Sequence, residues 1–294
     1  MTDVLGFALP QYGPSARADI VRFAAAAEQM GADSLWVGDR LIAPVDPSVG
    51  YAGSDTIPEQ FRTGFDPFIA LALAAAVTER VALGASVLVA PWYAPAVLAR
   101  QLTALDVASG GRLRPGFGIG WSPEEFAAAG APFRRRGAQL DEMLDALDAI
   151  WTTNPASHDG EHWTLPPSWI DLKPEQSPRP PIYLSAMTPA SLKRVGERAD
   201  GWLPVALVPG FVMPDVLTMQ RQTIDEAARA AGRDPADIDT VVRINVSEGA
   251  TPDDVAEAVR VLADGGYDNV FVDLMYVAAD TDDYLRWAQR LLEG

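Results

Sequence analysis

Short apolar runs alternate with longer amphipathic runs along nearly the whole chain. The apolar runs are strand-like and occupy residues 5–9, 34–37, 81–89, 113–119, 182–184, 202–205, 241–246 and 269–272. Between them, apolar residues recur at helical spacing, as in Ile20, Phe23, Ala27 and Met30, and again in Leu140, Met143, Leu144, Leu147, Ile150 and Trp151. This alternation is typical of a parallel sheet with helical crossovers.

Eight strand–helix units in 294 residues predict an α/β fold, a (β/α)8 TIM barrel formed as one domain by residues 1–294. It is longer than the usual length of about 250 residues because of loop insertions. A doubly wound open sheet is the alternative. In a barrel, the segments 39–65, 121–136, 206–213 and 273–280 follow strands and lie on the C-terminal face, where such folds carry their sites. The Pro-rich stretch 152–181, with His158 and His162, follows a helix and is expected on the opposite face.

Composition and charge narrow the class of protein. The net charge of −17 and pI near 4.4 disfavour unspecific binding to nucleic acid or to an anionic membrane. There is no cysteine, so disulfides and thiolate chemistry are excluded, and with two histidines we expect no metal site. Without an apolar run of about 18 residues or a leader, we expect a cytoplasmic protein that acts on a small molecule.

Three glycines alternate along one of the predicted strands. Gly116, Gly118 and Gly120 need a reason there, because glycine packs poorly in a strand and loses more entropy on folding. Close approach of a flat ligand is one reason, and room for large side chains in a tapering barrel is the other. The chain has no Ser-His-acid set, Walker loop or dinucleotide fingerprint, so a cofactor is expected to carry the chemistry.

Several ordered motifs resemble the luciferase-like flavin and deazaflavin oxidoreductases, named after bacterial luciferase. They lie at residues 31–39, 78–88, 105–113, 118–121, 179–186 and 199–204. Within this group the chain most resembles the enzymes that use coenzyme F420, a deazaflavin. The resemblance implies a hydride-transferring oxidoreductase and a homodimer. A flavin mononucleotide (FMN) monooxygenase that needs a separate reductase, and a non-catalytic flavin-binding barrel, are the alternatives.

The resemblance also implies which residues contact the cofactor ring. Ser86 and Val87 match the place where relatives carry a non-prolyl cis peptide bond against the cofactor ring. A buried hydroxyl bonded to its own backbone would also explain Ser86. Gly118, Gly120 and Trp121 would approach the ring or its ribityl chain, unless Trp121 only packs in the core.

The same resemblance implies a phosphate site where the fifth strand turns into a helix. A helix N-terminus offers free N–H donors to a phosphate, although relatives have two glycines at the first two of these positions. The residues concerned are Ser185, Ala186, Met187 and Thr188. One turn on, Lys193 and Arg194 would meet a polyglutamate tail or form an ordinary solvated helix face.

Two adjacent polar residues are the candidates for catalysis. Asp39 matches a position near the pyrimidine edge of the cofactor, with a helix-cap aspartate as the alternative. Arg40 departs from the family, which commonly has histidine there, and arginine cannot serve as a base. Arg40 would hold an anionic substrate or the deprotonated cofactor, or would pair with Asp39. Aromatic and apolar residues are expected to form the substrate pocket: Tyr51, Phe61, Phe65, Trp92, Tyr93 and Met213.

Overall fold

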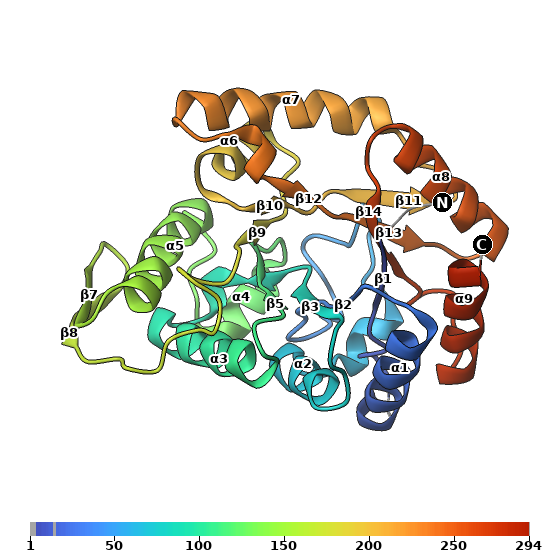
Figure 1. Cartoon of the computed structure of the whole chain (residues 1–294), viewed down its shortest axis with the longest axis horizontal. Helices are drawn as coiled ribbons and strands as arrows, with labels where there is room; N and C mark the ends of the chain where they lie inside the picture. Colours follow the sequence, from blue (N-terminus) through green and yellow to red (C-terminus); the bar gives the residue numbers. More distant parts are fainter. Residues whose placement is uncertain (1–3, 14–15, 294) are drawn as a thin grey trace.

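The computed structural model describes residues 4–13 and 16–293, and its strands are surrounded by helices (Figure 1). The central strands are β1 (Val4–Ala8), β2 (Ser34–Val37), β3 (Ala82–Ala85), β4 (Leu88–Val89), β5 (Leu113–Arg114), β6 (Gly116–Gly118), β9 (Tyr183–Leu184), β10 (Gly201–Trp202), β11 (Val205–Val208), β12 (Asp239–Thr240), β13 (Val242–Val246) and β14 (Asn269–Asp273). The α-helices are α1 (Ala16–Met30), α2 (Pro67–Ala75), α3 (Pro95–Ala108), α4 (Pro123–Ala129), α5 (Arg136–Thr152), α6 (Pro189–Arg198), α7 (Pro214–Ala230), α8 (Pro252–Asp264) and α9 (Thr281–Glu293). Short 3-10 helices occupy Glu59–Thr63, Ala90–Trp92 and Pro235–Asp237.

The strand pairings pass through every predicted strand run in chain order and return to the first. One sheet has the order β11-β13-β14-β1-β2-β3-β5 and the other has the order β12-β10-β9-β6-β4. Four predicted runs contribute one strand to each sheet: β3 and β4, β5 and β6, β10 and β11, and β12 and β13. Within the two sheets, every pair of neighbouring strands is parallel. The predicted (β/α)8 barrel is therefore confirmed, and the doubly wound alternative is set aside.

Four of the eight runs are each divided into two short strands, which the sequence did not predict. Pro115 separates β5 from β6, and Pro204 lies between β10 and β11. Proline has no N–H to donate to a strand ladder, so a break at these positions is expected. Ser86 and Val87 separate β3 from β4 in the third run.

The Pro-rich stretch forms a hairpin that projects from the barrel beside α5 (Figure 1). Strands β7 (Ala156–Asp159) and β8 (Thr164–Ser168) pair antiparallel in a separate two-stranded sheet. His158 and His162 both contact Glu142 of α5, at 3.4 Å and 2.7 Å respectively. Glu142 also accepts hydrogen bonds from backbone N–H groups of the hairpin, so these side chains hold the hairpin on the helix.

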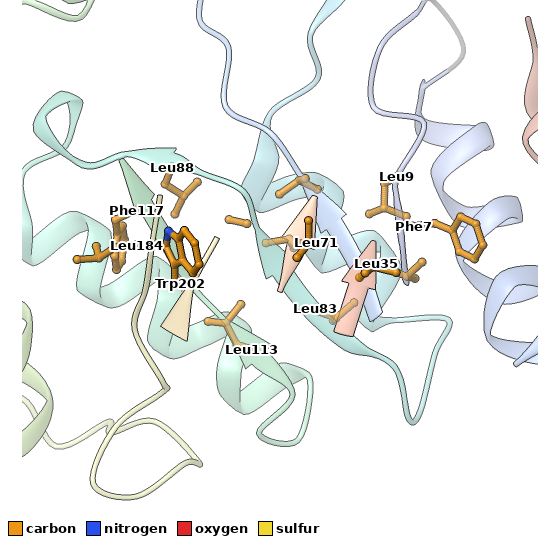
Figure 2. Close-up of a cluster of buried hydrophobic side chains, with 14 of the residues drawn as sticks. Phe7, Leu9, Leu35, Leu71, Leu83, Leu88, Leu113, Phe117, Leu184 and Trp202 are labelled. Atoms are coloured by element: carbon orange, nitrogen blue, oxygen red, sulfur yellow. The ribbon is translucent and has the colours of Figure 1, made fainter. Parts of the chain in front are cut away.

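Apolar side chains fill the space between the strands and the helices, and a smaller cluster fills the barrel interior. Figure 2 shows part of the larger core, in which Leu88, Phe117, Leu184 and Trp202 pack together. In the interior cluster, the rings of Trp36 and Phe271 stack with centroids 4.8 Å apart. No helix within the described ranges is long and apolar enough to cross a membrane.

Candidate active site

One pocket at the mouth of the barrel gathers most of the residues predicted to bind the cofactor. Its volume of about 370 Å³ falls within the usual range for small-molecule sites, about 300–1,000 Å³. The predicted residues that line it are Asp39, Arg40, Tyr51, Phe61, Ser86, Val87, Gly118, Gly120, Trp121, Ser185, Ala186, Met187 and Thr188. Their convergence makes this pocket the candidate active site, while their individual roles stay predictions.

Contacts within the protein account for the missing side chains at two of the alternating glycines. A Cβ atom at Gly116 would lie 2.1 Å from the carbonyl oxygen of Ala85, and one at Gly118 would lie 2.6 Å from Cγ2 of Val87. Crowding inside the barrel therefore leaves no room for a side chain at these two positions, although at Gly116 the nearest atom belongs to the backbone and not to a large side chain. Gly118 still lines the pocket, together with the Val87 side chain that packs against it.

The segment between β3 and β4 forms part of the pocket wall. Its Ser86–Val87 peptide bond is cis, as the family resemblance implies. The N–H of Ser86 donates to the carbonyl oxygen of Val37 at 2.8 Å. The carbonyl oxygen of Ser86 accepts a hydrogen bond from Nη1 of Arg243 at 2.9 Å. This segment is therefore tied both to the neighbouring strand and to a side chain from the far side of the barrel.

Asp39 lies just beyond the end of β2, and its side chain is buried rather than placed at a surface cap. Its Oδ2 accepts hydrogen bonds from the N–H of Val89 at 3.0 Å and from the hydroxyl of Tyr93 at 2.8 Å. Burial raises the pKa of Asp39 to about 6, although these two donors and the nearby Arg40 act in the opposite direction. A carboxyl group with this pKa can take up or release a proton close to neutral pH.

Arg40 is held firmly at the edge of the pocket. Its Nε donates to the backbone oxygen of Asp39 at 2.7 Å, and its Nη1 lies 2.9 Å from Oε2 of Glu125. The contact with Glu125 has the distance of an ion pair but not the angles of a hydrogen bond. The guanidinium carbon lies 5.3 Å from the ring centre of Phe61 and 5.1 Å from that of Trp121. Stacking between two rings suits the planar guanidinium, which can only donate hydrogen bonds.

The start of α4 fixes the loop that follows Arg40. Glu125 is 1% exposed, and its Oε1 accepts a hydrogen bond from the N–H of Leu41 at 2.9 Å. Burial raises the pKa of Glu125, while the charge of Arg40 opposes this rise. The preceding Glu124 accepts a hydrogen bond from the N–H of Ser48 at 2.9 Å. Two adjacent carboxylates therefore anchor the loop that covers one side of the pocket.

The predicted phosphate segment lies at the start of α6, but part of its donor set is already in use. Thr188 is the N-cap of α6 and forms a capping box with Ser191. The N–H groups of Met187 and Thr188 both donate to the hydroxyl of Ser191, at 3.2 Å and 2.9 Å. Pro189 has no N–H. The hydroxyl of Ser191 is also in use, because it donates to the carbonyl oxygen of Thr188 at 2.9 Å. The role of this segment in phosphate binding stays a prediction.

Lys193 and Arg194 of α6 differ in exposure, because Lys193 is 65% exposed and Arg194 is 17% exposed. Lys193 is exposed and pairs with Glu197 at 3.4 Å. Arg194 forms two hydrogen bonds with Asp141 of α5. Lys193 therefore fits the solvated helix face, whereas Arg194 joins α6 to α5, and the polyglutamate interpretation stays a prediction.

The residues predicted to form the substrate pocket divide into two groups. Tyr51 and Phe61 line the pocket, with ring centres 5.0 Å apart, and Tyr51 lies 5.6 Å from the ring of Trp121. The others lie outside this lining: Phe65, Trp92, Tyr93 and Met213. Tyr93 instead donates a hydrogen bond to Asp39. Met213 is the residue just before α7, and it is 48% exposed. Of the six residues predicted to form the substrate pocket, only Tyr51 and Phe61 therefore line it.

Four charged or tyrosine residues at the site were missed by the sequence interpretation. Tyr12 and Arg243 line the pocket, Asp273 pairs with Arg243, and Glu125 pairs with Arg40. A signal was present for Arg243, because it is a charged residue inside an apolar strand run. Among the described residues, no group of histidine, aspartate and glutamate side chains is arranged to hold a metal ion.

Comparison with known proteins places these observations in a family. A model of the luciferase-like monooxygenase family matches residues 4–292. A phthiodiolone/phenolphthiodiolone dimycocerosates ketoreductase of Mycobacterium tuberculosis is 32% identical over 243 residues, which are 80% of this chain and 62% of that protein. The chain spans only 62% to 64% of the length of the first curated relatives that it matches.

Solved structures share the fold over nearly the whole chain. The monooxygenase RslO1 from Streptomyces bottropensis has a TM-score of 0.81 and 21% identity, and covers 99% of this chain and 98% of its own. An F420-dependent secondary alcohol dehydrogenase in complex with an F420-acetone adduct has a TM-score of 0.76 and 17% identity, and covers 99% and 98%. At these identities the similarity shows the fold alone.

Proposed function

The chain belongs to the luciferase-like monooxygenase family, and from this premise we propose that it is an oxidoreductase that uses the deazaflavin coenzyme F420. Its substrate is a small hydrophobic or planar organic compound with a carbonyl group, or the corresponding alcohol. Cytoplasmic location and a homodimer remain predictions from the sequence and the family.

The observation that carries this proposal is the convergence of segments 86–87, 118–121 and 185–188 on one pocket beside Asp39 and Arg40. The lining combines a carboxylate, two guanidinium groups, several hydroxyls and aromatic rings. These groups suit a polar ring system with a hydroxylated, phosphorylated tail. Ser86, Val87 and the 118–121 segment would hold the ring, and the start of α6 would hold the tail.

When bound, the deazaflavin would supply or accept a hydride. The protein would handle the accompanying proton and orient the substrate. Asp39 is suited to hold or release that proton, because its pKa is about 6. Arg40 would donate a hydrogen bond to the substrate oxygen, since it stays charged and is fixed by Glu125 and two rings. Tyr51 and Phe61 would exclude water on the aromatic side.

The comparisons support reduction of a carbonyl. One curated relative is named a ketoreductase, and one structural neighbour was solved with an F420-acetone adduct. A second candidate is an FMN-dependent monooxygenase that receives reduced flavin from a separate reductase. It is favoured by the family description and by the similarity to RslO1.

A binding titration separates the two candidates. The purified protein is titrated with F420 and, separately, with FMN, and binding is followed by absorbance and by quenching of cofactor fluorescence. We expect saturable binding of F420 that is at least about tenfold tighter than that of FMN, a difference of about 1.4 kcal/mol. Tight binding of FMN without binding of F420 would reject the deazaflavin proposal and favour the monooxygenase.

A further inference from the structure

Arg243 reaches across the mouth of the barrel to the segment predicted to support the cofactor ring. It lies on β13, whereas Ser86 lies just after β3, and these strands do not pair with each other. Nη1 of Arg243 nevertheless donates a hydrogen bond to the carbonyl oxygen of Ser86 at 2.9 Å. The two residues are 157 positions apart in the sequence, so this contact exists only in the closed barrel.

Asp273 holds Arg243 in place from the adjacent strand. Nη2 of Arg243 donates to Oδ2 of Asp273, and Oδ1 of Asp273 accepts a hydrogen bond from the N–H of Met275 at 3.0 Å. The side chain of Asp273 is 6% exposed and that of Arg243 is 17% exposed. Burial alone lowers the pKa of Arg243, but the Asp273 carboxylate raises it, and the net direction is upward. Arg243 therefore stays protonated beside the pocket, and its charge is balanced by Asp273.

The exposed part of Arg243 faces the candidate active site. Arg243 lines the pocket together with Ser86 and Val87, and it also lines a small cavity next to Tyr12. Its Nε is buried and has no hydrogen-bond partner among the described residues. Leaving the Nε–H of Arg243 buried without an acceptor costs free energy. The two hydrogen bonds of Nη1 and Nη2 therefore have to offset this cost and fix the position of the side chain.

We infer that Arg243 is a positioning residue for the bound flavin-type ring. It fixes the Ser86 carbonyl, and with it the wall formed by Ser86 and Val87, and it places a charged hydrogen-bond donor at that side of the pocket. This inference rests on the proposed function, because it requires a flavin-type ring to lie against Ser86 and Val87. It does not depend on whether the ring belongs to F420 or to FMN. The positioning role must be distinguished from a purely structural one, in which Arg243 only neutralises the charge of Asp273.

Three variants separate these roles. Arg243→Met removes both the charge and the contact with Ser86, Arg243→Lys keeps the charge but cannot donate at two fixed positions, and Arg243→Met with Asp273→Asn removes the pair without leaving a lone buried charge. The readouts are the dissociation constants for F420 and FMN and the visible absorbance spectrum of the bound cofactor. Circular dichroism and urea unfolding establish that each variant is folded.

A matched control is available outside the pocket. Arg221 of α7 is also partly buried and donates to Asp225, to Thr240 and to the backbone oxygen of Pro235. Arg221→Met removes a similar set of contacts away from Ser86. It is expected to affect unfolding without changing the dissociation constant or the spectrum of the bound cofactor.

We expect Arg243→Met to weaken binding of the preferred cofactor at least about tenfold, the effect of losing one charge-assisted hydrogen bond. We also expect the absorbance spectrum of the bound cofactor to shift in Arg243→Met. Arg243→Lys should recover part of the affinity and part of the spectral shift, and the double variant should bind the cofactor as weakly as Arg243→Met. Wild-type affinity in the double variant would show that Arg243 only neutralises Asp273, and would overturn the inference. Unchanged binding in Arg243→Met would overturn it as well. If the wild-type protein binds neither cofactor, the proposed function fails, and this inference fails with it.

Discussion

The hydroxyl of Tyr93 donates a 2.8 Å hydrogen bond to Oδ2 of Asp39, and the N–H of Val89 donates to the same oxygen at 3.0 Å. Both donors favour the ionised carboxylate, whereas burial favours the protonated form. Burial wins in part, because the pKa of Asp39 is raised to about 6. The pocket therefore contains a group that changes charge near neutral pH, and the hydroxyl of Tyr93 tunes it.

Replacing Tyr93 with phenylalanine tests this tuning. Without the hydroxyl, one of the interactions that lower the pKa of Asp39 is lost, so the pKa moves upward from about 6. We expect the limb of the kcat/KM pH profile that reports Asp39 to move to higher pH. Tyr267→Phe is the control, because the Tyr267 hydroxyl contacts Thr218 instead. An unmoved limb in Tyr93→Phe would show that another group controls the profile.

Asp39→Asn is expected to make the protein more stable and less active. The pKa of Asp39 is about 6 in the folded protein, against an ordinary value of 3.8, so the folded state binds the proton more tightly than the unfolded state. The charged form is therefore unfavourable in the folded protein above pH 6, by up to about 3 kcal/mol, and this cost disappears as the pH falls toward the unfolded value. Urea unfolding should show a gain of about 1–3 kcal/mol for Asp39→Asn at pH 7.5, and little gain at pH 4. An equal gain at both pH values would contradict the raised pKa.

Glu125→Gln tests the ion pair that fixes Arg40. The substitution keeps the shape of the side chain but leaves the Arg40 charge without its buried partner. Loss of one partner from a buried pair costs about 3–5 kcal/mol, so the free energy of unfolding should fall by an amount of that order. The exposed pair of Glu161 with Arg135 provides the control, and Glu161→Gln should leave the urea midpoint unchanged. Equal effects of the two substitutions would argue against a special role for the pair at the pocket.

Thr188→Glu tests the predicted phosphate end of the pocket. A negative charge at this position should repel the phosphate and weaken cofactor binding at least about tenfold, or about 1.4 kcal/mol. Thr188→Ser keeps the N-cap hydroxyl and should bind the cofactor like the wild-type protein. Affinity that is unchanged in Thr188→Glu would place the phosphate elsewhere.

The strand order was predictable because buried parallel strands appear as continuous apolar runs separated by amphipathic helices. The breaks within runs were harder to predict, although Pro115 and Pro204 mark two of them. The β7–β8 hairpin was missed because Pro166 and Pro167 argue against a strand. In a two-stranded sheet both strands are edges, where proline is tolerated.

The candidate site was predictable where it depends on strand ends and less so where it depends on side-chain direction. Segments such as 86–87 and 118–121 converge because the carboxyl ends of the barrel strands meet at one mouth. The contact of Arg243 with Ser86 depends on the direction of one side chain inside the closed ring, which the strand pattern does not give. The direction of the Tyr93 side chain was not predictable either. Tyr93 was expected beside the substrate, but its hydroxyl donates a hydrogen bond to Asp39.

The most direct test of the proposed activity is turnover in the absence of oxygen. Reduced F420 is mixed anaerobically with the protein and a panel of ketones, enones and imines, and the absorbance of the oxidised cofactor is followed. Hydride transfer predicts substrate-dependent oxidation of the cofactor without oxygen and formation of the reduced product. The account would be contradicted if turnover occurred only with reduced FMN and oxygen, and F420 remained reduced with every compound.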